Sequence, residues 1–118
     1  MAASATIEVR TRSAFSAVIA FCDVVAVGVI KALAEAGVTV PRDVSVVGFD
    51  NIELSQYLPV SLTTLDTRKK DLARYSISTL LAQLQGDGAR KGGDRVTKRL
   101  KPKLVIREST GPPSGRRG

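Results

Sequence analysis

The segment VSVVGFDNIE, residues 44–53, is the part of the sequence that decides the fold. Its first six residues show almost no polar alternation, which is typical of a parallel strand covered on both faces. The run then stops at Asp50 and Asn51, an acid beside an amide. Two interpretations are open: the pair forms a turn with its side chains bonded to nearby backbone amides, or the strand ends by presenting ligand-binding groups.

An apolar strand and a helix precede this segment. Residues 14–21, AFSAVIAF, form a compact apolar run of strand length. Residues 23–37, DVVAVGVIKALAEAG, follow at once, and we expect a helix that Asp23 caps at its start and Gly37 ends. Because this helix is apolar nearly all round until Ile30, we expect more than one surface to cover it.

A second strand and helix follow a polar loop that ends at Ser61. Residues 61–65, SLTTL, predict a short strand, and the next helix runs to about Gln85 with Asp66 or Thr67 as its cap. We expect four leucines on the inner side of this helix: Leu72, Leu80, Leu81 and Leu84.

The order of these elements indicates an α/β fold with a largely parallel sheet. Residues 95–109 contain extended stretches interrupted by Pro102, which fits an edge strand or a crossing segment better than a central strand. We expect one region over residues 15–110, between a poorly determined segment at 1–14 and a disordered tail at 111–118. In parallel sheets ligands bind at the carboxyl ends of strands, where Asp23 and Asp50 fall.

The composition excludes several classes of site. The 118 residues include no histidine and one cysteine, Cys22, so imidazole chemistry, an internal disulfide and a CxxC metal site are excluded. We expect no metal and no cofactor. No run of 18 apolar residues predicts a membrane span, and the N-terminus does not have the pattern of a secretory signal, so we expect a cytoplasmic protein without a membrane partner.

The net charge of +7 is confined to the last third of the chain. Residues 1–85 hold eight basic and eight acidic residues, whereas residues 86–118 hold ten and three. No aromatic residue lies in that basic segment, so it offers no stacking platform for single-stranded nucleic acid. We favour a solvated basic segment, with weak nonspecific attraction to phosphates as the alternative.

Four motifs occur in order and resemble the C-terminal part of the LacI/GalR family of bacterial transcriptional regulators, a match that covers roughly residues 16–110. They are DVVAVG at 23–28, AGVTVPRDVSVVGFD at 36–50, LTTL at 62–65 and LVIRESTG at 104–111. The resemblance implies part of a periplasmic-binding-protein-like core, a three-layer Rossmann-like subdomain with a parallel sheet. It also implies a second subdomain that clamps a small metabolite, commonly a sugar, and a helix-turn-helix that binds operator DNA; we expect this chain to be truncated and to lack both.

The resemblance also implies site residues. Asp50 corresponds to the carboxylate that contacts the effector, and Cys22 stands where the family usually has a polar contact, often asparagine. We expect Asp23 to act as a helix cap, and Cys22 to be a buried small residue near the cleft. The spacing of the acids ties none of them to a shared substrate, so we do not expect an enzyme.

The family also forms dimers through the helix that begins at Asp23 and through the loop that contains Tyr57. The resemblance therefore implies a homodimer interface that includes Val24, Val27, Ile30 and Tyr57. Our interpretation is a partial effector-binding and dimerisation domain of a regulator, with operator DNA as a partner only through the N-terminal domain that we expect to be absent. The alternatives are a fragment of a sugar-type solute-binding protein, or a nonfunctional remnant that associates with itself.

Overall fold

The computed structural model describes residues 15–86 and 97–113, so the predictions for residues 1–14 and for the end of the tail lie outside it. The chain divides into two compact units, one formed by residues 1–66 and 104–118 and the other by residues 67–103. The described elements follow the predicted order of strand, helix, strand, loop, strand, helix and strand, with a short 3-10 helix in the loop.

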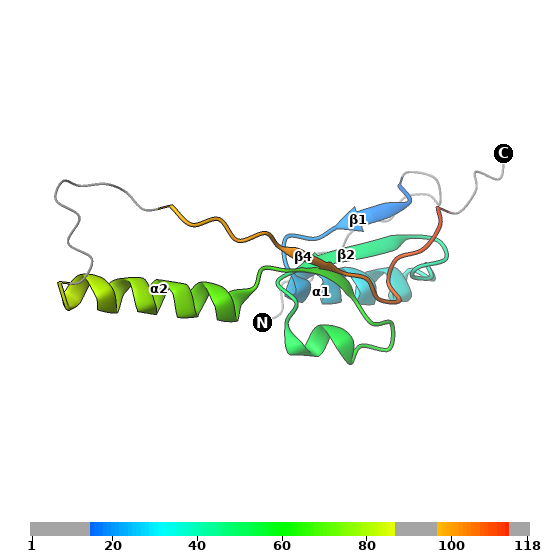
Figure 1. Ribbon diagram of the computed structural model, residues 1–118. Coiled ribbons are helices and arrows are strands. Elements are labelled where there is room, and N and C mark those ends of the chain that lie inside the picture. Colours follow the sequence, from blue (N-terminus) through cyan, green and yellow to red (C-terminus); the bar gives the residue numbers. More distant parts are fainter. Residues whose placement is uncertain (1–14, 87–96, 114–118) are drawn as a thin grey trace. The chain divides into compact units, whose positions relative to one another are not determined.

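The first unit is built on a sheet whose strand order is β1-β2-β3-β4 (Figure 1). The strands are β1 (Ala17–Ile19), β2 (Ser45–Phe49), β3 (Thr63–Asp66) and β4 (Lys103–Val105). β2 pairs in parallel with β1 and with β3, which confirms the α/β class with a parallel sheet. β4 directly follows Pro102 and lies at the edge of the sheet, as expected.

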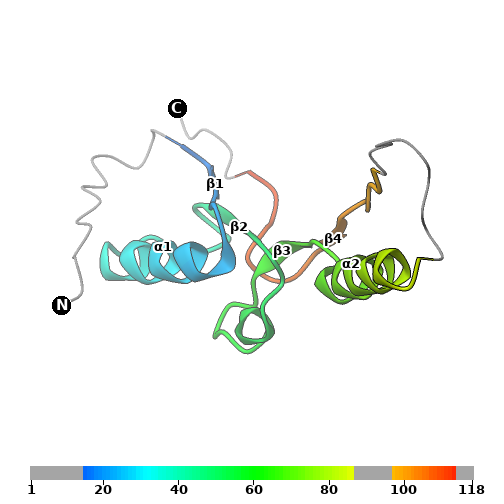
Figure 2. The same cartoon turned by 90° about the vertical axis from the view of Figure 1, so that its left-hand side faces the viewer.

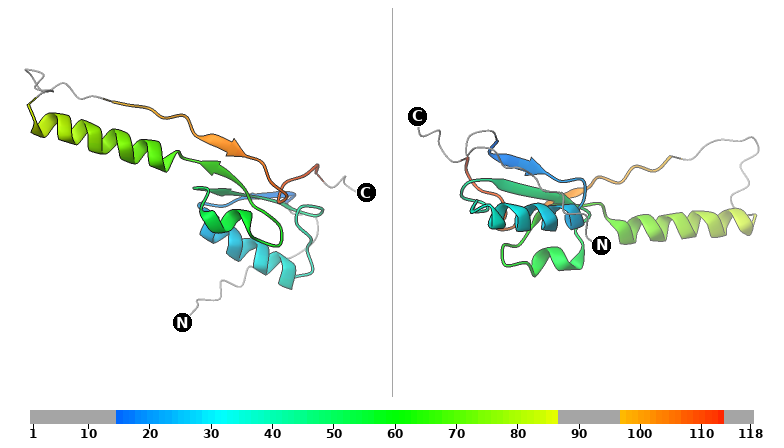
Figure 3. Two further views of the ribbon diagram at one scale, coloured as in Figure 1. Left: turned by 60° about the horizontal axis from the view of Figure 1, so that its bottom comes forward. Right: turned by 180° about the vertical axis from the view of Figure 1, so that it is seen from behind.

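Helix α1 (Asp23–Glu35) packs against β2 on one face of the sheet (Figure 3). Figure 2 shows the 3-10 helix η1 (Glu53–Gln56) on the same side. Along β2 the side chains alternate, so that Val46 is buried while Phe49 is 39% exposed. The prediction that this strand is covered on both faces is therefore wrong for the described part of the first unit, where helices lie on one face only.

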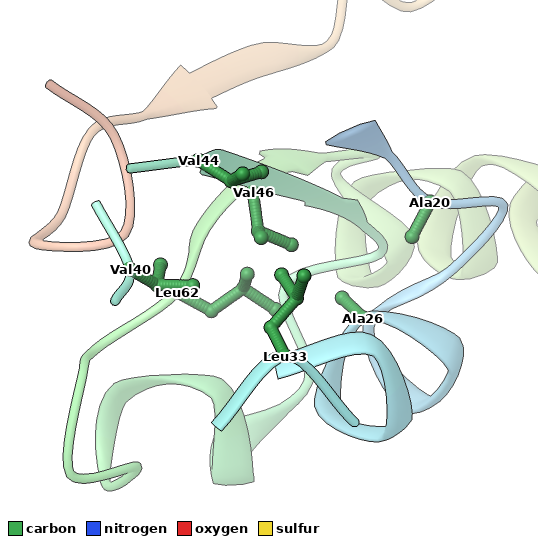
Figure 4. Close-up of a cluster of buried hydrophobic side chains, with 7 residues drawn as sticks. All are labelled: Ala20, Ala26, Leu33, Val40, Val44, Val46 and Leu62. Atoms are coloured by element: carbon green, nitrogen blue, oxygen red, sulfur yellow. The ribbon is translucent and has the colours of Figure 1, made fainter. Parts of the chain in front are cut away.

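The core of the first unit lies between α1 and the sheet (Figure 4). α1 contributes Ala26 and Leu33, β2 contributes Val46, and Leu62 enters from the residue before β3. Both Ala26 and Leu62 are fully buried. Burial of these side chains stabilises the fold by about 25 cal/mol for each Å² of apolar surface removed from water. It also fixes α1 against the middle of the sheet.

The two ends of α1 differ in how well the sequence predicted them. Gly37 has a positive φ of 74° and ends the helix, because the backbone N–H of Val38 donates to Leu33 O at 2.8 Å and that of Gly37 to Ala34 O at 3.0 Å. At the other end the capping position is Cys22, without a side-chain bond, so the predicted cap at Asp23 is wrong. The Asp23 carboxylate has another role, described below.

The second unit contains α2 (Lys69–Leu84) and an extended segment that leads to β4. Its capping residue is Arg68 in the left-handed conformation, not Asp66 or Thr67, and Arg68 donates to Asp71 at 2.9 Å. Lys98 lies 5.4 Å from the centre of the Tyr75 ring, which is within the range of a cation–π contact.

No residue of α2 is buried. The predicted inner leucines are about half exposed or more: Leu72 at 50%, Leu80 at 50%, Leu81 at 49% and Leu84 at 75%. That prediction is wrong because the described part of this unit has only one helix and one extended segment, which do not form a core. None of the three described helices has the length and hydropathy that crossing a bilayer requires.

Candidate functional site

The carboxyl ends of the parallel strands bring together residues that are distant in the sequence. Cys22 follows β1, Asp50 follows β2, and Asp66 is the last residue of β3. Because β1, β2 and β3 run in the same direction, these three positions lie at the same end of the sheet, where the strands have their carboxyl ends. Ligands of open α/β sheets bind at the carboxyl ends of the strands, so this end of the sheet is the candidate site.

The backbone at the end of β2 adopts an unusual conformation. Asp50 has a φ of 111° and Asn51 a φ of 50°, both in the region that residues other than glycine rarely adopt. Asparagine tolerates the left-handed conformation. The predicted bonds from the Asn51 side chain to nearby backbone amides are wrong, because this side chain bonds those of Asp66, Arg107 and Ser55. Asp50 is further from an allowed region, and strain of this kind costs about 1–3 kcal/mol and clusters at functional sites.

The fully buried Asp23 carboxylate holds this strained turn in place through hydrogen bonds. Its Oδ1 accepts a hydrogen bond from the Thr64 hydroxyl at 2.6 Å, and its Oδ2 accepts one from the backbone N–H of Ile52 at 2.9 Å. The Thr64 oxygen in turn accepts from the backbone N–H of Asn51 at 3.2 Å. Asp23 and Thr64 therefore hold two successive amides of the loop that begins at Asp50.

Gly48 explains how Asp23 reaches so far into the sheet. A Cβ atom at position 48 would collide with the Asp23 carboxylate and would lie 2.8 Å from a methyl group of Leu62. Gly48 itself has no positive φ, so the glycine is required for space and not for backbone conformation. The glycine in the VVGFD motif thus makes room for the acid that begins α1.

The Asn51 side chain links the loop to β3 and to the segment after β4. Its Nδ2 donates to Asp66 at 3.1 Å, while its Oδ1 accepts from Arg107 at 2.8 Å and from Ser55 at 3.5 Å. Arg107 also donates to Ser55 at 2.9 Å and to the carbonyl of Leu62 at 2.9 Å. A half-buried guanidinium thereby joins three parts of the first unit.

The remaining residues of the C-terminal motif join β2 to β3. The hydroxyl of Ser109, which is fully buried, donates to Val46 O at 2.6 Å and accepts from the backbone N–H of Thr63 at 2.8 Å. Glu108 points outward and accepts from both the backbone N–H and the hydroxyl of Ser61, at 3.2 and 3.1 Å. The backbone of Ser109 also bonds Val46 and Ser61, so this residue lies between the starts of β2 and β3.

The structure places the other predicted residues as follows. Cys22 is half-buried, so the expectation that it is buried is wrong; its free thiol lies at the start of α1, at the carboxyl end of the sheet. Val24 is 67% exposed and Tyr57 is 69% exposed, so both present apolar surface. Val27 and Ile30 are half-buried, and Ile30 packs against the core of its own unit.

Sequence reasoning missed Thr64 and Arg107, which build the scaffold of the site, and Ser109, which joins β2 to β3 away from it. The sequence shows these residues only as polar positions, and their partners are up to 56 positions away, so only the fold reveals their contacts. Among residues 15–86 and 97–113, no three His, Cys, Asp or Glu side chains are grouped so that they could hold a metal ion.

Comparisons with known proteins agree with this geometry. A model described as the periplasmic binding protein-like domain matches residues 2–110. The HTH-type transcriptional repressor PurR of Glaesserella parasuis is 41% identical over 96 residues, which cover 80% of this chain and 28% of the repressor.

Two solved structures of LacI family transcriptional regulators are also similar. The one from Enterococcus faecium with bound ribose is 34% identical, with a TM-score of 0.75 over 85% of this chain and 36% of that chain. The one from Arthrobacter sp. FB24 in complex with lactose is 36% identical, with a TM-score of 0.69 over 81% of this chain and 35% of that one. This chain therefore spans about a third of the length of each.

Proposed function

We propose that this chain, which belongs to the periplasmic binding protein-like domain family and matches the C-terminal effector-binding region of LacI-type regulators, binds a small-molecule effector through Asp50. The observation that carries the proposal is the strained backbone of Asp50 at the carboxyl end of β2. Hydrogen bonds that involve Asp23, Thr64 and Asn51 hold the loop after β2 in place, and backbone strain of this kind clusters at functional sites.

The chemistry of Asp50 favours a ligand that offers several hydrogen-bond donors. A carboxylate accepts at about four lone-pair positions, so it binds two adjacent hydroxyl groups in a bidentate manner. The similar regulators with bound ribose and lactose are complexes with such polyhydroxylated molecules. We therefore propose a sugar or a related metabolite as the effector class.

Cys22 is the second residue that we place at the effector. It follows β1, the neighbour of β2, and therefore lies at the same carboxyl end of the sheet as Asp50. A thiol is a weak hydrogen-bond donor and acceptor, so Cys22 contributes apolar contact and shape more than polar recognition. We propose that it packs against the carbon skeleton of the effector, and that the chain binds its ligand without a chemical reaction.

Self-association and transcriptional regulation complete the proposal. Val24 and Tyr57 expose apolar surface on α1 and on the loop after η1, and we propose that this surface, with Val27 and Ile30, pairs with a second copy. Regulation of transcription places the protein in the cytoplasm. The chain has no specificity for an operator of its own in this account, and DNA recognition belongs to other parts of a longer regulator.

Calorimetric titration tests the effector proposal. D-ribose, lactose and sucrose are titrated separately into the chain, into Asp50→Asn and into Glu35→Gln. The two variants remove the same charge, but Glu35 is exposed at the last residue of α1, where its ion pair with Lys31 is 4.0 Å long. We expect Asp50→Asn to weaken binding of at least one sugar by about tenfold or more, since a charged hydrogen-bond partner is lost. Equal binding by both variants would contradict the assignment of Asp50.

A further inference from the structure

The strained turn at Asp50 and Asn51 requires something to hold it. A non-glycine residue at positive φ persists only where the surrounding contacts determine its conformation. The backbone N–H of Asp50 donates to Leu65 O at 2.9 Å, and that of Asn51 donates to Thr64 at 3.2 Å. These bonds tie the two amides to β3, whereas the Asn51 side chain also contacts Ser55 and Arg107, which lie outside the two strands.

The contacts of the Asn51 side chain define its orientation. Arg107 only donates hydrogen bonds, so the group 2.8 Å from its Nη2 must be the oxygen of the amide. The amide nitrogen then faces the Asp66 carboxylate at 3.1 Å, which accepts from it. A cation on one side and a carboxylate on the other thus hold the amide in one orientation.

Arg107 is itself fixed by bonds that do not involve Asn51. Its Nη1 donates to Ser55 and to the Leu62 carbonyl, each at 2.9 Å, and its backbone N–H donates to the Thr63 hydroxyl at 2.9 Å. Two nitrogens of one planar guanidinium therefore contact three acceptors. A lysine ammonium keeps the charge but cannot reproduce this fork, because it is a single point of donation.

We propose that Arg107 is a positioning residue for the effector carboxylate: through Asn51 it holds Asp50 at positive φ and so sets the direction of the Asp50 side chain. The inference rests on the proposed function in one respect, which is that Asp50 contacts the effector. Two residues of the segment at 104–110 then have different roles: Arg107 contributes to ligand recognition, whereas Ser109 contributes to packing. Arg107 acts through Asn51, without touching the effector.

Backbone NMR of the isotope-labelled chain tests the proposal without a ligand. A residue at positive φ gives a strong amide-to-α-proton NOE within the residue, because the two protons lie close together. We expect this signal at Asp50 and Asn51 in the unaltered chain and its loss at both residues in Arg107→Lys. Ser109→Ala is the control, since Ser109 is buried in the same segment and bonds Thr63 and Val46 but not Asn51. It should lower stability and leave both NOEs unchanged.

A titration with D-ribose adds the functional readout. If ribose binds the unaltered chain, Arg107→Lys should weaken it by about tenfold, the effect of misplacing one charged hydrogen-bond partner, while Ser109→Ala should not. Unchanged NOEs at Asp50 and Asn51 in Arg107→Lys overturn the proposal whether or not ribose binds. Loss of the NOEs without ribose binding to any variant supports the positioning role and counts against the proposed function alone.

A second variant covers the case in which Arg107→Lys does not fold. Asn51→Gly removes the side chain that Arg107 holds, and glycine adopts a φ of 50° without strain. The bonds of Arg107 to Ser55 and Leu62 remain available in this variant. We expect Asp50 to lose its positive-φ signal; retention of that signal shows that the Asn51 side chain does not hold Asp50, and the proposal fails.

Discussion

The Asp23 carboxylate occupies the space that a Cβ atom on Gly48 would need. The first residue of α1 and the fourth residue of β2 are thus matched to each other, although 25 positions separate them in the sequence. The match lets a charged group at the start of a helix reach the sheet and bond Thr64. The turn at the candidate site depends on this arrangement.

Gly48→Ala should therefore destabilise the first unit. The added methyl group meets both the Asp23 carboxylate and Leu62, and overpacking of this kind costs about 1–3 kcal/mol. Gly28→Ala is the matched control, because nothing lies within 4 Å of a Cβ at that position of α1. An alanine in a helix is favoured over glycine by about 1 kcal/mol, so Gly28→Ala should stabilise. Urea unfolding measures the stability of both variants, and equal unfolding midpoints for the two would refute the packing argument.

Asp23→Ala should cost more than the loss of an ordinary helix cap. The change leaves the Thr64 hydroxyl and the Ile52 N–H without their partner, at about 1–3 kcal/mol for each buried group. A double-mutant cycle with Thr64→Val, followed by urea unfolding, isolates the pair. We expect the two changes to be non-additive by about 1 kcal/mol or more. If the two effects are additive and Asp23→Ala lowers the free energy of unfolding by only about 1 kcal/mol, Asp23 acts as no more than an ordinary helix cap.

The exposed surface of α1 should drive self-association. We expect light scattering to find the chain dimeric at high micromolar concentration, and Val24→Glu to give monomers because it places two like charges in the proposed interface. Ile77→Glu is the control: Ile77 is 57% exposed on α2, against 67% for Val24 on α1. If Ile77→Glu dissociates the dimer and Val24→Glu does not, the interface lies on α2.

DNA binding by the chain should be weak and independent of sequence. The described basic residues of the second unit include Lys98, Arg99 and Lys101 in an exposed or half-exposed extended segment. Contacts of such residues with phosphates weaken steeply as salt rises. Fluorescence anisotropy with two unrelated duplexes should give the same affinity and the same salt slope for both. Preference for one duplex by about a thousandfold, the range of specific recognition, would show a reading element that this account lacks.

The sequence predicted the β-α-β unit well because its signals are local. The apolar run before Phe49 and the glycine at position 37 each determine their own element. The prediction failed where distant partners decide. Asp23 has the sequence pattern of a helix cap, but its carboxylate bonds a threonine that lies 41 positions later.

The candidate site shows the same limit. Asp50 was identified by its place after a strand and by resemblance to a family motif, and its role in binding remains a prediction. Arg107 follows an edge strand, and only the folded chain shows that its guanidinium reaches Asn51, 56 positions away. The leucines of α2 have helical spacing, which predicts a buried face, yet the described part of their unit contains nothing that buries them.

The central claim is that a sugar-type effector is bound by Asp50 at the carboxyl edge of the sheet. Its most direct test is an NMR titration of the labelled chain with D-ribose and, separately, with lactose. The account predicts saturable shifts of the amide signals of Cys22, Asp50 and Asn51 with at least one sugar, and their loss in Asp50→Asn. Saturable shifts confined to other parts of the chain, or shifts that Asp50→Asn leaves unchanged, would contradict it.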